Sequence, residues 1–301
     1  MNEISLKRLA LIKRLFMLGV AQSYEPEPLN GFSILSFHDS LEMFVKLCTD
    51  SKGIKSKGAP SLMDYFTIIP ELGMQPQINN LNIIRNKIKH GGLFPNTLDI
   101  ESCRTNALEF LRISSKSILD EDFDSVSLIA LIQFENVRVL LKKAEFQLLH
   151  EDYPNAIANA AYAFRELLYC YEQNKHRYYK SLFDLSHDFH HIGSNVQLDT
   201  KIDHALNEIG DAIECLNERI KILGLGLNYK DYIKFTTLIP EILNAWWKND
   251  LESRYESLPN PHIKYNRKNA QFCIDFVIES AISIQRQNFS TEDLYLEQDV
   301  K

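Results

Sequence analysis

The sequence has few cysteines and none of the patterns that mark a disulfide framework or a cysteine-rich zinc site. Five of the 301 residues are cysteine, and they are far apart, odd in number and never arranged as Cys-x-x-Cys. Disulfide frameworks and structural zinc sites use even or closely spaced sets. We therefore expect reduced thiols, packed in the core. The five are Cys48, Cys103, Cys170, Cys215 and Cys273.

Long apolar runs are also missing. No run approaches the ~18 apolar residues that a membrane span needs. Near the start of the chain, basic residues interrupt the apolar ones at Lys7, Arg8, Lys13 and Arg14, which does not fit the apolar core of a signal peptide. These absences predict a soluble, cytoplasmic protein with no membrane partner.

A surplus of positive charge is the third absence. The formal net charge is −7, whereas proteins that coat nucleic acid non-specifically usually carry a basic surplus. We expect no DNA partner, and any contact with RNA has to be local, through a small basic site. Hydrophobic residues make up 45% of the chain, which is enough for a large core.

What is present is helical periodicity along most of the chain. Apolar residues recur at three- and four-residue intervals, and no hairpin dipeptide separates alternating runs. The sequence therefore predicts an all-α protein. The predicted helices are Ile4–Val20, Ser33–Cys48, a short one after Pro60, Asn79–His90, Asp99–Ser115, Ser127–His150, Tyr153–Gln173, Asp199–Leu225, Lys230–Trp247 and Asn266–Arg286.

An acidic, polar segment, Leu119–Asp124, separates two helical series. We place a domain boundary there, because the helical pattern starts again at Ser127. The predicted domains are two tandem helical bundles, residues 1–120 and residues 125–301.

The two halves resemble each other and predict an internal duplication. In each, a long helix leads into a second one, which reads Ser-Leu-Glu-Met-Phe at 40–44 and Phe-Arg-Glu-Leu-Leu at 164–168. After a variable loop, setting Arg219 on Arg85 places Gly226 on Gly92 without a gap, and it places Gly224 on His90. The second copy therefore keeps the arginine and lacks the histidine.

The segment that carries chemistry is Arg-Asn-Lys-Ile-Lys-His, residues 85–90, followed by two glycines. It resembles the signature of the HEPN superfamily (higher eukaryotes and prokaryotes nucleotide-binding domains), in which an arginine precedes a polar residue, three further residues and a histidine. The resemblance implies a small helical bundle with the motif late in the domain, and an acid-bearing second helix that matches Asp39 and Glu42. It further implies a homodimer that brings two motifs together across a cleft.

These residue types suit RNA cleavage that needs no metal ion or other cofactor. The 2′-hydroxyl acts as nucleophile, and a histidine titrates in the range needed to move its proton. An arginine grips phosphate through two hydrogen bonds. We predict Arg85, Asn86 and His90 as catalytic residues, with Asp39, Glu42 and Lys89 in support.

The motif raises a geometric question. Residues five apart on an α-helix point about 140° apart, at ~100° per residue. Either the helix ends at His90, which frees its direction, or the cleft takes Arg85 from one subunit and His90 from the other. Alternatively, the basic residues before the paired glycines only stabilise the end of the helix. Asp39 and Glu42 either form ion pairs with Arg85 or are exposed polar residues without a role in the site.

Two other groups of residues give weaker evidence for a function. His187 and His191 lie four residues apart but lack a third metal ligand, so we predict no metal site there. Trp246 and Trp247 are expected to anchor a helix or an interface.

The leading hypothesis is an endoribonuclease active in stress response or phage defence, with RNA and a second copy as partners, and an antitoxin or defence-system protein as a further one. Gly92 stands where some HEPN toxins have a modified tyrosine, which argues against a nucleotidyltransferase antitoxin. The alternatives are a non-catalytic RNA- or nucleotide-binding module and a helical scaffold for protein contacts.

Overall fold

Ten α-helices and one small sheet are assigned in the part of the chain that the computed structural model describes, residues 2–55, 58–173, 200–244, 251, 254–258 and 261–288. This confirms the predicted all-α class. The chain divides into two compact units, unit 1 (Met1–Leu131) and unit 2 (Ile132–Lys301). Within the described residues, no helix is both long and apolar enough to cross a membrane.

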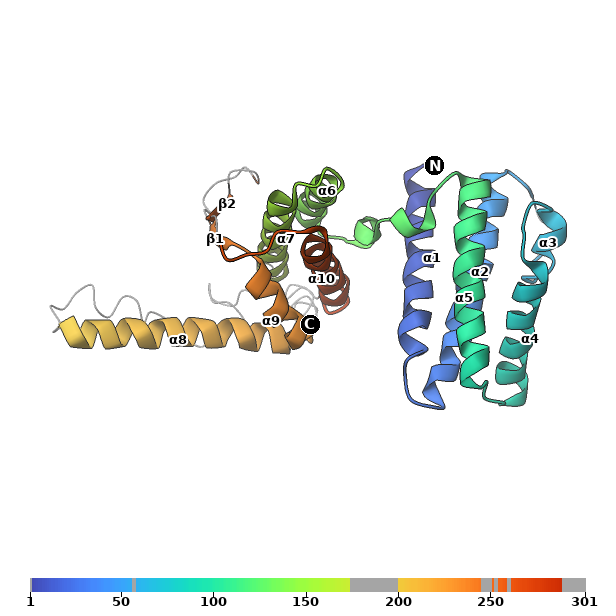
Figure 1. The fold of residues 1–301 in the computed structure, drawn as a ribbon, viewed down its shortest axis with the longest axis horizontal. Helices are drawn as coiled ribbons and strands as arrows, with labels where there is room; N and C mark the ends of the chain where they lie inside the picture. Colours follow the sequence, from blue (N-terminus) through green and yellow to red (C-terminus); the bar gives the residue numbers. More distant parts are fainter. Residues whose placement is uncertain are drawn as a thin grey trace, which may run out of the picture. The chain divides into compact units, whose positions relative to one another are not determined.

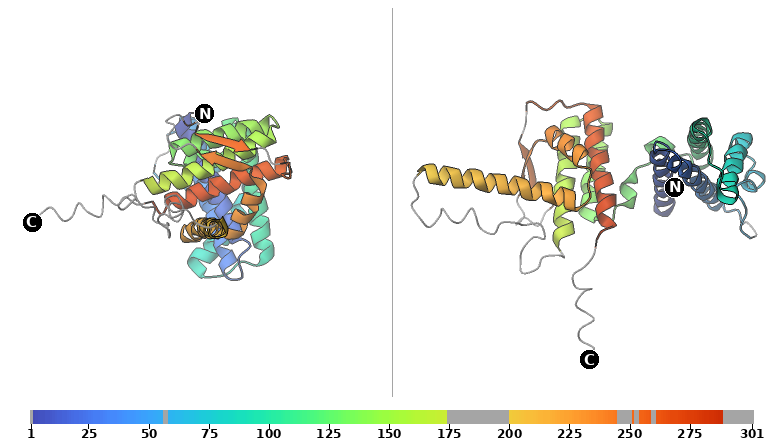
Figure 2. Two further views of the ribbon diagram at one scale, coloured as in Figure 1. Left: turned by 90° about the vertical axis from the view of Figure 1, so that its left-hand side faces the viewer. Right: turned by 90° about the horizontal axis from the view of Figure 1, so that it is seen from below.

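Unit 1 is a bundle in which α1 and α2 pack along each other, and α4 and α5 pack against α2 (Figure 1; Figure 2 adds the view along the helices). Gly19 lets α1 approach α2, since a Cβ there would lie 2.7 Å from Cε1 of Phe37. The core is rich in phenylalanine, and the rings of Phe44 and Phe110 meet edge to face. The helices of unit 1 are α1 (Glu3–Gln22), α2 (Phe32–Ser51), α3 (Tyr65–Ile68), α4 (Gln75–Gly91) and α5 (Thr97–Ser114).

Unit 1 extends further along the chain than the predicted boundary. Phe123 is buried in its core and meets Phe16 edge to face. Lys13 Nζ donates to the backbone carbonyls of Asp124 and Val126, at 2.7 and 2.8 Å. The acidic segment therefore folds back on unit 1, because Leu119 and Phe123 are buried in its core and Lys13 of α1 binds the backbone at the end of the segment.

Unit 2 is built on α6, α7 and α10, with α9 against α10 and the C-terminal end of α8 against α9. Phe164, Phe235 and Phe276 form an aromatic cluster in its core. The elements are α6 (Glu135–Leu149), α7 (Tyr153–Gln173), α8 (Thr200–Gly224), α9 (Tyr229–Leu238), β1 (Glu241–Asn244), β2 (Tyr255–Leu258) and α10 (Arg267–Gln285).

Two predicted helices of this half are wrong in extent. The helix predicted from Ser127 starts only at Glu135, because Phe134 is extended and the N–H of Gln133 donates to the side chain of Gln285 on α10. The helix predicted to run to Trp247 ends at Leu238. Pro240 follows and holds Ile239 in an extended conformation.

The chain then forms β1, which pairs antiparallel with β2, so the strand was missed from the sequence. Trp246, Trp247, His187, His190, His191 and the acidic tail from Ser290 lie outside the described residues.

The glycines aligned by the predicted duplication adopt the same backbone conformation. Gly92 follows α4 with φ +61° and Gly226 follows α8 with φ +63°. Left-handed glycines of this kind end helices, because they let backbone N–H groups reach the last free carbonyls. The two helices share a left-handed glycine near their ends but differ in its place, because Gly92 follows α4 directly and Gly226 lies two residues after α8. The duplication itself stays a prediction.

The cysteines are all free thiols. Cys48, Cys103 and Cys273 are buried, as predicted, whereas Cys170 is half-buried and Cys215 is exposed. Burial raises the pKa of the Cys48 and Cys273 thiols to about 12, so both are protonated packing groups near neutral pH.

Candidate functional site

The helix α4 fixes where the motif lies in unit 1. It starts after Met74, which has φ +62°, with a proline in its first turn. Its buried side chains, Ile78, Leu81 and Ile84, anchor one face in the core. Arg85 follows Ile84 directly, so the motif occupies the part of the helix that leaves the core.

Arg85 is half-buried, whereas Asn86, Lys89 and His90 are exposed. A guanidinium Nη1 of Arg85 donates to Oδ1 of Asn86 at 3.0 Å. Within the described residues, Arg85 has no carboxylate partner. Its remaining N–H groups are therefore available to an anion, which is what recognition of a phosphate requires.

The end of α4 bears on the first of the two geometric options, a helix that ends at His90. The helix continues through Gly91, so His90 lies inside its last turn. Gly92 then caps it, with its N–H donating to the carbonyl of Ile88 at 3.1 Å. Since the helix does not end at His90, Arg85 and His90 of one chain point about 140° apart. This divergence is the geometry that a cleft shared between two chains would use.

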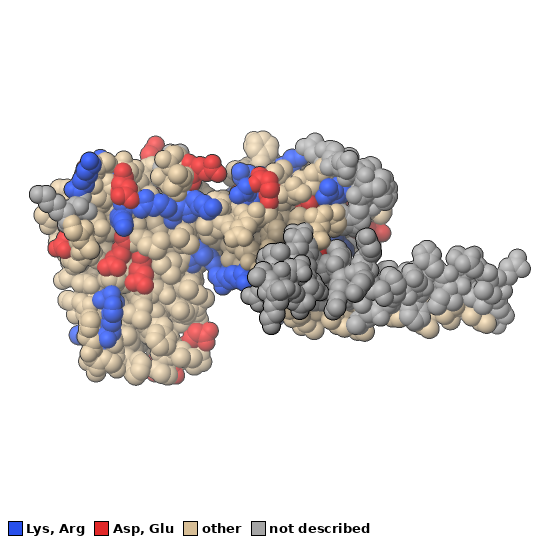
Figure 3. All heavy atoms as spheres, turned by 180° about the vertical axis from the view of Figure 1, so that it is seen from behind, with Lys and Arg blue, Asp and Glu red and all other residues tan. Residues whose placement is uncertain are grey.

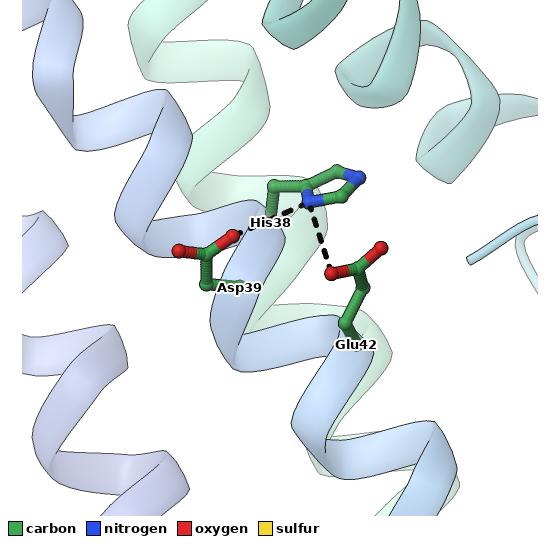
Figure 4. Close-up of side chains that lie close together, drawn as sticks. All are labelled: His38, Asp39 and Glu42. Atoms are coloured by element: carbon green, nitrogen blue, oxygen red, sulfur yellow. Dashed lines mark ion pairs between the residues drawn. The ribbon is translucent and has the colours of Figure 1, made fainter. Parts of the chain in front are cut away.

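Asp39 and Glu42 do not pair with Arg85, contrary to one of the two options. Both belong to α2 and lie beside His38, whose Nδ1 is 3.6 Å from Oδ1 of Asp39 and 3.9 Å from Oε2 of Glu42 (Figure 4). His38 was missed, although a histidine and a glutamate four residues apart on a helix face the same way and could have signalled the cluster.

His38 also links α2 to the motif helix. It is 2% exposed, and its Nε2 lies 3.1 Å from Oδ1 of Asn82 on α4. Asn82 precedes Arg85 by three residues, about one helical turn. The His38–Asn82 contact therefore holds the stretch of α4 from which the motif arginine projects.

The corresponding carboxylate of unit 2 forms buried hydrogen bonds that stabilise the fold. Glu166, aligned with Glu42, is fully buried on α7. Nη1 of Arg254 donates to both its oxygens, at 3.0 and 2.8 Å, and Asn136 and Tyr255 donate as well. Burial alone would raise the pKa of Glu166, but these hydrogen bonds outweigh it and lower the pKa.

The remaining motif positions of unit 2 offer less than those of unit 1. Arg219 is exposed, and Gly224 supplies no side chain where unit 1 has His90. On the predicted alignment, unit 2 therefore has an arginine and no histidine at the motif positions.

Charges are mixed on the face of unit 1 drawn in Figure 3. Lysine and arginine side chains lie there among aspartate and glutamate side chains. This agrees with the net charge of −7.

Comparisons with protein-family models, with curated proteins and with solved structures find no match to this chain. The function therefore has to be inferred from the motif and its surroundings. Those surroundings offer one half-buried arginine with open donors, one exposed histidine at a helix end and a buried histidine that holds the motif helix in place.

Proposed function

We propose that this protein is a metal-independent endoribonuclease of the HEPN type that works as a homodimer, in stress response or phage defence. The observation that carries the proposal is the state of Arg85, which is half-buried, held by Asn86 and without a carboxylate partner among the described residues. The guanidinium of such an arginine can donate two hydrogen bonds to one phosphate.

The chemistry follows from the side chains. His90 removes the proton of a ribose 2′-hydroxyl, and the oxygen attacks the adjacent phosphorus. Arg85 stabilises the negative charge that builds up on the phosphate oxygens, and Asn86 orients the guanidinium. The bond to the 5′-oxygen breaks, and that oxygen takes up a proton. The products carry a 2′,3′-cyclic phosphate and a 5′-hydroxyl.

The decisive experiment is cleavage of a mixed RNA pool in EDTA, with analysis of the product ends. We expect fragments with 2′,3′-cyclic phosphates, since no metal-activated water takes part. Intact RNA bound by the protein would favour the non-catalytic binding module. Intact RNA without binding would favour the scaffold.

An apolar patch beside the motif supports the homodimer. The chain leaves α4 through Leu93 and Phe94, which are 60% and 66% exposed. A Cβ built on Gly31 would lie 3.1 Å from Cδ of Pro95, so this loop lies against the start of α2, where Phe32 is also exposed. Contiguous exposed apolar groups mark contact surfaces, and this one adjoins His90 in sequence.

We therefore expect a dimer that dissociates when Phe94 is replaced by aspartate. Burying a phenylalanine contributes about 1.5–3 kcal/mol, and symmetry applies it twice, so the dissociation constant should rise at least about 100-fold. RNA cleavage should fall with it. Sedimentation velocity over a concentration series measures the first effect, and the RNA pool assay measures the second.

Two controls define the surface. Leu149→Asp removes a side chain that is 76% exposed on α6 of unit 2 and should leave the dimer intact. A second apolar stripe runs along α8 at seven-residue intervals through Ile209 and Leu216, each about half exposed. A dimer that survives Phe94→Asp but dissociates with Ile209→Glu and Leu216→Glu would move the interface to α8 and contradict the proposal.

A further inference from the structure

Three metal-binding atoms converge beside the motif helix. Nδ1 of His38 and one carboxylate oxygen each of Asp39 and Glu42 all lie within 4.8 Å of one another. His38 comes from the buried side of α2, whereas the two carboxylates are partly exposed. Figure 4 shows both carboxylates turned toward the same ring nitrogen.

The hydrogen bond on the other side of the ring determines what Nδ1 presents. Nε2 faces Oδ1 of Asn82 at 3.1 Å, and an amide oxygen only accepts hydrogen bonds. Nε2 therefore carries a ring proton, and whenever the imidazole is neutral Nδ1 presents its lone pair. That nitrogen is buried and has no hydrogen-bond partner.

A lone pair that faces two carboxylates calls for a cation between them. The ring is in the arrangement typical of metal-bound histidine, whose second N–H donates to an oxygen that fixes tautomer and orientation. A tetrahedral ion with bonds of about 2.0–2.2 Å holds its ligands about 3.3–3.5 Å apart. The separations of 3.6 and 3.9 Å reach that range with small movements of two exposed side chains.

We propose that His38, Asp39 and Glu42 form a binding site for a divalent transition-metal ion, with Zn²⁺ the best fit. Imidazole selects zinc and its neighbours over Mg²⁺ and Ca²⁺, which prefer oxygen ligands alone. The exposed side of the cluster leaves room for water to complete the coordination. The bound ion stabilises His38, whose contact with Asn82 of α4 is present without the ion.

The ion has a structural role that is separate from the proposed cleavage chemistry. Its ligands come from α2, and no step at the scissile phosphate passes through it. The proposal can therefore be tested without RNA, and its failure would leave the proposed nuclease untouched.

The test is isothermal titration of Zn²⁺ into the full chain after removal of metal with EDTA and of EDTA by dialysis. Wild type should bind one more equivalent of Zn²⁺ than Glu42→Gln does, or should bind that equivalent at least about tenfold more tightly. Glu42 is partly exposed, so this variant keeps the core intact. Asn82→Ala should weaken binding about 10–100-fold, the range seen for groups that support a metal ligand. His90→Ala, which removes an exposed histidine of the same unit, should bind as wild type does.

Two measurements keep the outcome unambiguous. Zn²⁺ should raise the melting temperature of wild type and not that of Glu42→Gln, since ligand binding stabilises only a fold that has the site. Equal zinc binding by wild type, Glu42→Gln and His38→Gln would overturn the proposed site. So would nitrogen NMR spectra that place the ring proton of His38 on Nδ1, which would mean that Asn82 donates through its amide nitrogen instead.

Discussion

Arg85→Ala and His90→Ala are each expected to reduce cleavage of the RNA pool by about 10²–10⁴-fold. Loss of a general base lowers rates by 10²–10⁴, and loss of a group that stabilises transition-state charge lowers them by 10²–10³. The double variant should be little slower than the worse single one, because groups that act together are not additive. Initial rates in EDTA at one pH measure all three.

Matched variants show whether a loss of cleavage comes from the missing catalytic group, from a change of net charge or from misfolding. Lys87→Ala removes a positive charge from the same exposed helix end and should cost less than tenfold, through weaker attraction of RNA. Arg85→Lys keeps the charge but loses the planar pair of donors, so most of the rate should still be lost. Equal cleavage by wild type, Arg85→Ala and His90→Ala would remove this motif as the active site.

Mixing the two inactive variants tests how the cleft is built. Because Arg85 and His90 of one chain diverge on α4, a composite cleft would combine the arginine of one subunit with the histidine of the other. A heterodimer of Arg85→Ala with His90→Ala then contains one intact cleft and one doubly damaged cleft. Random re-pairing of a two-fold dimer should restore about a quarter of the wild-type rate. If each chain carried its own complete site, mixing would restore nothing.

The helices of unit 1 could be predicted because their apolar spacing is regular and their ends carry strong signals. Pro28 and Gly31 precede α2, and Gly92 ends α4 in the left-handed conformation that paired glycines suggest. Periodicity failed in one place because of a contact distant in sequence, and in another because of a local proline. Gln133 is held by Gln285 of the last helix, and Ile239 is extended by the proline after it.

The candidate site was predictable as a segment and not as a set of contacts. Arg85, Asn86 and His90 follow from a local pattern, and the structure places all three on one helix end. The partners of Asp39 and Glu42 depend on which neighbour is closest on α2 and on what α4 presents to it. The spacing of His38 and Glu42 is visible in the sequence, whereas the burial of His38 and its contact with Asn82 are not.

Glu166→Ala is expected to destabilise unit 2 by about 3–5 kcal/mol, the range for removing one partner of a buried ion pair. The substitution leaves Arg254 and the donors from Asn136 and Tyr255 facing a cavity on α7. Urea unfolding followed by tryptophan fluorescence reports this unit, since both tryptophans of the chain, Trp246 and Trp247, belong to it. Glu208→Ala, which changes an exposed carboxylate on α8, should shift stability by less than about 0.5 kcal/mol.

The same carboxylate gives unit 2 a defined pH dependence. Hydrogen bonds hold the pKa of Glu166 below its ordinary value although burial opposes them. The folded state therefore binds this proton less readily than the unfolded chain, whose glutamates titrate near ~4.3. The stabilisation is fully present above that pH and is lost as the pH falls through the folded pKa. The urea midpoints of wild type and Glu166→Gln should differ most near neutral pH and approach each other in acid. A difference that stays constant down to the acid transition would mean that Glu166 acts through packing and not through its charge.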